Sequence, residues 1–224
     1  MNKAISFVKL DIITVKPYMT LKNLIILICL PVFLMWANNS IPFAAGIIMV
    51  FGALFISYPF AVGEKNGIDA LYATLSIARN TVVLGRYLFA LTLNLCTGTL
   101  GFILAYLSSA VLKIDFQIGE TVLIILVLFA AYSIVHAFQL PIYFKLGYTK
   151  AKFSAYIPLM VLPLMMITIS SLIQNSDVTA TLSAIPAWID KNSLLFLTAC
   201  VLLWIALEII SYRVSLAYYR KRDF

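Results

Sequence analysis

Few side chains in this sequence could carry out chemistry, and none of them is grouped as in a catalytic or metal site. The chain has one histidine, which excludes a zinc-protease motif with two histidines on one helix. No Gly-x-Ser-x-Gly marks a serine nucleophile, and no Gly-x-x-x-x-Gly-Lys-Ser/Thr loop could cradle a nucleotide phosphate. Three isolated cysteines favour packing over disulfide or metal binding: Cys29, Cys96 and Cys200. We therefore predict a non-enzyme without a catalytic, cofactor or metal site of its own.

Two polar residues lie inside apolar runs and form a candidate intramembrane polar site. Glu208 is the only acid within such a run, and a carboxylate in hydrocarbon marks a pathway or a partner by default. It also lies near the end of its run, close to Arg213, where water or a cation is within reach, and this favours a structural role. His136 lies alone in another run, where a histidine more often bonds to a neighbour than acts as a catalyst or ligand.

Six mostly apolar stretches must position these side chains. They are Leu21–Ala37, Ile41–Gly63, Tyr87–Leu112, Thr121–Phe144, Phe153–Ile173 and Ser193–Ala217. A helix needs about 20 such residues to cross the membrane, where only a helix satisfies its own backbone groups. The chain is 63% hydrophobic and 11% charged, whereas soluble domains carry about 25% charged residues. We predict an all-α integral membrane protein with six transmembrane helices in one domain, residues 1–224.

The positive charge predicts how the chain is oriented. Of the 16 Lys and Arg residues, only Lys113 and Lys191 lie outside the two termini and the connections at 64–86 and 145–152. Cationic segments stay on the cytoplasmic side, so both termini and these two connections are predicted to be cytoplasmic. The net charge of +7 is assigned to contact with anionic lipid, because the chain has no nucleic-acid-reading motif.

The ends of the predicted bundle carry two further features. Residues 1–20 have apolar side chains at helical spacing and are interrupted by Lys9 and Asp11, which predicts a helix lying in the inner interface and not a signal peptide. A frayed, solvated tail is the alternative. On the outer side only the extracellular loop 174–192 has room for an interfacial helix. The apolar positions of the first segment are Ile5, Val8, Ile12 and Val15.

The cytoplasmic loop over residues 64–86 carries the strongest functional signal. Gly67 permits a turn, after which apolar residues return at three- and four-residue spacing and predict a short helix with one apolar face. Arg79 and Arg86 flank the inner membrane surface. An apolar face at the cytoplasmic side needs a cover, which is either a partner or the membrane itself. The apolar positions are Ile68, Leu71, Tyr72 and Leu75.

This loop resembles the first cytoplasmic loop of ABC-2-type permeases, the membrane subunits of one class of ABC transporter. That loop runs roughly Glu-Lys-x-x-Gly-(Thr/Ile)-(Asp/Glu)-x-Leu-x-x-x-Leu-Pro-(Ile/Val)-(Ser/Thr)-Arg, followed by a few apolar residues and Gly-(Lys/Arg). Two positions depart, since Ser76 replaces the proline and Ala78 replaces the hydroxyl residue. The matching positions are Glu64, Lys65, Gly67, Asp69, Leu71, Leu75, Ile77, Arg79, Gly85 and Arg86.

The resemblance implies a permease subunit of an ATP-driven exporter in a bacterial plasma membrane. A coupling helix in the loop would dock in a groove of a separate ABC ATPase, present in two copies and holding ATP and magnesium. A second permease, identical or a close paralogue, would complete the transporter, and small subunits of this kind resemble exporters of amphipathic or bacteriocin-like peptides. The implied coupling interface comprises Glu64, Lys65, Gly67, Asp69, Leu71, Tyr72, Leu75 and Arg79.

Two other functions are weighed against export. An ion-coupled secondary transporter would place coupling carboxylates near mid-membrane between two related halves, and the sequence shows neither a repeat nor a central acid. A non-transporting membrane scaffold or immunity protein would bind its partner through the same loop. Transport assays separate these functions.

Overall fold

The structure, a computed structural model, describes residues 2–18, 20–38, 41–75, 77–113, 116–157, 160, 164 and 193–222. This part of the chain is helical and contains no strand, which confirms the predicted all-α fold class. The elements are α1 Asn2–Val15, η1 Lys16–Tyr18, α2 Leu21–Asn38, α3 Ile41–Phe55, α4 Tyr58–Lys65, α5 Ile68–Thr74, α6 Arg79–Leu112, α7 Ile118–Leu146, α8 Tyr148–Ala151, η2 Lys152–Tyr156 and α12 Ser193–Arg220.

Within the described ranges, four helical segments are long and apolar enough to cross a membrane: Ala45–Lys65, Arg79–Leu112, Thr121–Leu146 and Leu197–Arg220. Segments Ile5–Tyr18 and Leu21–Ala37 meet at 88°, and this bent pair would be a fifth crossing if it forms one span. The structure therefore shows four or five of the six predicted crossings. Most of the predicted crossing Phe153–Ile173, and the whole predicted loop 174–192, lie outside the described residues.

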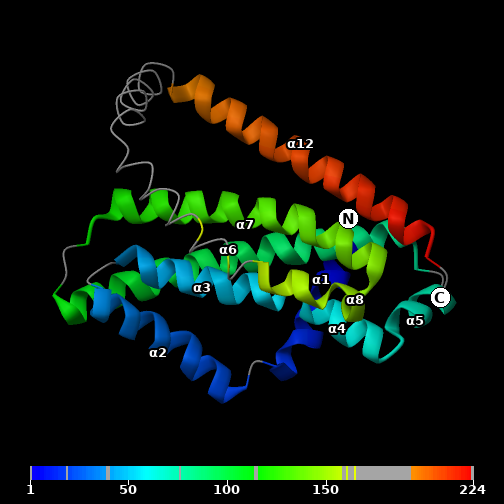
Figure 1. Cartoon of the computed structure of the whole chain (residues 1–224), viewed down its shortest axis with the longest axis horizontal. Coiled ribbons are helices and arrows are strands. Elements are labelled where there is room, and N and C mark those ends of the chain that lie inside the picture. The colour runs from blue at the N-terminus through cyan, green and yellow to red at the C-terminus, as the bar shows by residue number, and fades with distance from the viewer. Residues whose placement is uncertain are drawn as a thin grey trace.

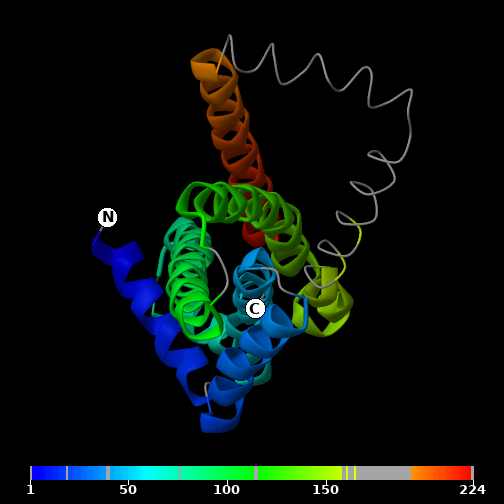
Figure 2. The same ribbon diagram turned by 90° about the vertical axis from the view of Figure 1, so that its left-hand side faces the viewer.

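Helices α3, α6 and α7 pack against one another and form the centre of the bundle (Figures 1 and 2). Helix α2 packs on α3, and α1 packs on α6. Helix α12 contacts both α6 and α7, and Figure 2 shows its N-terminal end diverging from the other helices. The predicted second crossing is divided into α3 and α4, because the chain turns at Ser57 and Pro59 occupies the first turn of α4.

One end of the bundle gathers α4, α5, α8, the start of α6 and the C-terminal end of α12 (Figure 1). We call this the basic end, because the cationic connections at 64–86 and 145–152 and the cationic C-terminus all lie there. Lys113, at the C-terminal end of α6, lies at the opposite end of the bundle. The charge alternation in the sequence is therefore matched in space, and the assignment of the basic end to the cytoplasm stays a prediction.

The contact between α1 and α6 depends on Gly85. A Cβ atom at this position would lie 2.7 Å from Cβ of Phe7 and 2.9 Å from Cδ1 of the same ring. Phe7 is itself buried, in a cluster that also contains Val82, Val83 and Phe144. The absence of a side chain at Gly85 thus lets the two helices approach closely.

We expect Gly85→Ala to destabilise the protein by about 1–3 kcal/mol, because α1 must shift away from α6 to accommodate the added methyl group. The midpoint of unfolding of the protein in lipid nanodiscs measures this. Gly119→Ala is the matched control, since nothing lies within 4 Å of a Cβ added there. Equal midpoints for the two variants would show that α1 is not held closely against α6.

Candidate partner-docking site

Helix α5 is the short helix predicted after Gly67, and it lies at the basic end between α4 and α6. Gly67 has a φ of +62°, a left-handed conformation that a glycine adopts without strain. The amide of Asn66 donates to the carbonyl oxygen of Val62 over 3.1 Å and ends α4. The loop therefore turns sharply and presents α5 as a separate element.

The inward side of α5 is fixed by packing. Tyr72 is 4% exposed and its ring centre lies 4.8 Å from that of Phe7 in an edge-to-face contact. Ile68 packs against the same buried cluster, which includes Tyr219 of α12. Burial raises the pKa of Tyr72 to about 12, so the phenol stays neutral at physiological pH.

The outward side carries two large apolar residues. Leu71 is 54% exposed and Leu75, just after the helix, is 62% exposed. We call these residues the leucine pair. The sequence predicted one apolar face from four residues, and the structure divides them, with Ile68 and Tyr72 turned inward and the leucine pair outward.

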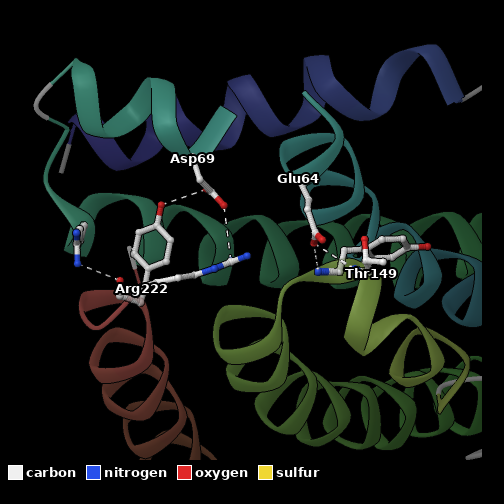
Figure 3. A network of polar contacts seen from close by, with 7 residues as sticks. Glu64, Asp69, Thr149 and Arg222 are labelled. Carbon is white, nitrogen blue, oxygen red and sulfur yellow. Dashed lines mark hydrogen bonds and ion pairs between the residues drawn. The ribbon is translucent and has the colours of Figure 1, made fainter. Parts of the chain in front are cut away.

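Glu64 joins α4 to α8, as Figure 3 shows. One of its carboxylate oxygens accepts the backbone N–H of Tyr148 and, over 3.1 Å, that of Thr149. Gly147 precedes these amides with a φ of +75°, and a Cβ there would lie 2.7 Å from both Glu64 Oε2 and Arg222 Nη2. The glycine thus leaves room for the carboxylate, and the position of α8 depends on Glu64.

Asp69 and Arg79 join the loop to the C-terminal end of α12. The hydroxyl group of Tyr219 donates to Asp69 Oδ1 over 3.2 Å, and Arg222 Nη1 lies 3.8 Å from Asp69 Oδ2 (Figure 3). The guanidinium group of Arg79 donates to the carbonyl oxygens of Tyr219 and Arg220. A cation at the carbonyl end of a helix also interacts favourably with the helix dipole.

A buried ion pair between α1 and α6 was not predicted. Asp11 Oδ1 lies 2.9 Å from Arg86 Nη1, and the two side chains are 1% and 5% exposed. The contact is an ion pair that lacks the alignment of a hydrogen bond. The guanidinium carbon of Arg86 also lies 4.8 Å from the ring centre of Phe60. The buried residues of α1 recur at four-residue spacing, at Phe7, Asp11 and Val15. This spacing is the sequence signal that could have placed Asp11 on the buried face of the helix.

The predicted coupling residues therefore divide into two groups. Glu64, Asp69, Tyr72 and Arg79 contact other parts of the same chain, as described above, and Gly67 forms the turn. Glu64 and Gly67 are exposed although they have these roles, and the remaining exposed members are Lys65, Leu71 and Leu75. A partner at the basic end would meet these three, while the other residues hold the docking element in place.

The second predicted site also takes shape in the structure. Glu208 and His136 line the same cavity of about 290 Å³ between α6, α7 and α12. His136 is buried, and Glu208 is partly exposed. Asn94, Ser133 and Trp204 were not predicted and line it as well.

The long apolar helices and the gathered cationic connections define a multi-pass membrane protein. The chain belongs to the ABC-2 family of transporter proteins, whose family model matches residues 6–220. It is therefore a permease subunit of an ABC transporter, of a family that works with ABC ATPases and is not itself catalytic. Neither a search of curated proteins nor one of solved structures finds a match.

Removing one partner of the Asp11–Arg86 pair should strongly destabilise the basic end. We expect Asp11→Leu or Arg86→Met alone to lower the free energy of unfolding by about 3–5 kcal/mol, because each leaves an uncompensated buried charge. The double variant should recover most of that loss. Unfolding midpoints of the four proteins form a double-mutant cycle, and additive losses in it would show that the two charges do not interact.

Proposed function

We propose that this chain is the permease subunit of an ATP-driven exporter and that the leucine pair docks in a groove of a separate ABC ATPase. The observation that carries the proposal is the exposure of Leu71 and Leu75, 54% and 62%, on an element whose opposite side is firmly packed. Large apolar side chains on a short helix are the anchors by which a helix binds a groove. Lys65, exposed close by, adds a cation at the edge of that surface.

The attachments of α5 suit it to transmit force. Asp69 ties α5 to the end of α12, and Arg79 ties the first residue of α6 to that same end. Glu64 ties the end of α4 to α8. A displacement of α5 by a partner would therefore act on several membrane helices at once, without further contact between partner and chain.

The energy for such a displacement comes from the partner. No P-loop sequence is present in the chain, so ATP and magnesium are held by the ATPase. We propose two copies of the ATPase and a second permease, either an identical copy or a close paralogue. The protein lies in a bacterial plasma membrane, and its basic end faces the cytoplasm because cationic segments stay on that side.

Amphipathic peptides are the proposed cargo, moved outward. Support for this comes from the apolar composition of the membrane helices, which suits a greasy or amphipathic molecule better than a long polar polymer. A bacteriocin-type peptide is a cargo of that chemistry. The leucine pair would equally serve a non-transporting scaffold or immunity protein, and only a transport measurement separates the two.

Leu71→Asp combined with Leu75→Asp should abolish co-purification with the partner ABC ATPase, because two charges would replace the apolar anchors. The pull-down is quantified as ATPase bound per permease. Leu146→Asp is the matched control, since this leucine is 44% exposed at the end of α7 and lies on another element at the basic end. Retained ATPase in the double variant, together with unchanged ATP turnover, would reject the docking site.

Transport itself should require ATP and both subunits. Inverted vesicles holding the permease and its ATPase are expected to accumulate a fluorescent amphipathic peptide when ATP and magnesium are supplied. Vesicles with the leucine-pair variant, or with an ATPase unable to hydrolyse ATP, should show only background uptake. Accumulation that persists without ATP would reject an ATP-driven mechanism, and a permease that binds its ATPase but moves no solute would favour the scaffold.

A further inference from the structure

The cavity between α6, α7 and α12 combines apolar walls with a few polar groups. Its volume is about 290 Å³. Leucines from α6 and α7 form much of the wall, and α12 contributes Trp204, Glu208 and Ile209. Such a cavity, largely apolar with a small number of convergent polar groups, has the usual character of a small-molecule site.

Three polar groups at this cavity are left without a hydrogen-bond partner among the described residues. His136 is 4% exposed and its Nε2 atom has none, and the same holds for the buried indole Nε1 of Trp204. Glu208 forms no ion pair within the part of the chain that the structure describes. A buried polar group without a partner is unfavourable, so the buried nitrogens of His136 and Trp204 favour a ligand that satisfies them.

Several other polar groups nearby are already engaged. The Tyr87 hydroxyl is bonded to the hydroxyls of Ser211 and Ser215, and that of Ser211 donates to the Ala137 carbonyl. The Asn94 amide donates to the Phe129 carbonyl over 3.1 Å. The polar groups that remain for a ligand therefore include the carboxylate of Glu208, the Nε2 of His136 and the N–H of Trp204.

We propose that this cavity binds an apolar molecule that carries a protonated amine. The ammonium group would pair with the carboxylate of Glu208 and donate to Nε2 of His136, and the apolar body would fill the leucine-lined wall. The Trp204 ring adds a π face for the cation, while its N–H suits a carbonyl next to the amine. Among the described residues, no Lys or Arg lines this cavity, so the charge of Glu208 would be complemented by the ligand.

Binding at this cavity does not depend on transport. Only its use as a cargo site rests on the proposed exporter function, and an amphipathic peptide with a free amino terminus would then fit it. Binding is therefore measured without ATP and without the ATPase. A failed binding test leaves the docking proposal standing, and a failed transport test leaves the cavity proposal standing.

The test uses the fluorescence of Trp204 in the full chain in nanodiscs made of phosphatidylglycerol. The other two of the three tryptophans are replaced by Trp36→Phe and Trp188→Phe. A bromoalkylamine and the bromoalkanol of equal length are titrated as quenching probes. We expect saturable quenching by the amine, with an apparent affinity about tenfold higher than that of the alcohol. Equal quenching by both probes, or quenching that never saturates, would overturn the proposal without any site variant.

Glu208→Gln should reduce the preference for the amine to less than about threefold, because the amide cannot pair with the ammonium charge. Arg213→Gln is the matched control, since it removes a charge from an exposed position on the same helix outside the cavity. A preference that survives Glu208→Gln would overturn the proposal. Adding phosphatidylethanolamine to the nanodiscs then distinguishes the source of the amine, since weaker binding of the probe shows that this lipid headgroup competes for the site.

Discussion

The buried ion pair between Asp11 and Arg86 is the contact on which the basic end depends. Two charges have been removed from water, and each is tolerable only while the other stays in place. The pair fixes α1 against α6, and the cluster around Phe7 and Tyr72 then gives α5 a surface to pack on. Loss of either charge would therefore disturb more than a local contact, because the inward side of the docking element rests on α1.

The charged residues of the loop motif act mainly inside the chain. Glu64 reaches α8, Asp69 and Arg79 reach the end of α12, and Arg86 reaches α1, so together they join the loop to three other elements. A motif that matches a partner-binding loop suggests that its residues face the partner. In the structure the leucine pair is exposed, whereas these charged residues contact other parts of the same chain.

The sequence predicts those features that depend on local periodicity and fails where distant residues meet. The apolar runs, the turn at Gly67 and the helix after it all follow from spacing. Spacing could not say which of the four apolar residues of α5 turn inward, because that depends on where α1 lies. On α1 itself, Ile5 and Ile12 were expected on an apolar face lying in the inner membrane interface, and in the bundle they are 46% and 49% exposed. The buried face includes Asp11, whose place there is set by a partner 75 residues away in the sequence.

Helix α12 connects the region of the leucine pair with the cavity between α6, α7 and α12. At its C-terminal end Tyr219 and Arg222 contact Asp69, and further toward its N-terminus Glu208 and Trp204 line the cavity. Between them, Ser211 and Ser215 bond to Tyr87 and hold the helix against α6. A helix transmits displacement along its axis because its backbone hydrogen bonds resist stretching. A movement of α5 and the filling of the cavity would thus act on one continuous helix, and the hydroxyl contacts with Tyr87 lie between the two places where they act.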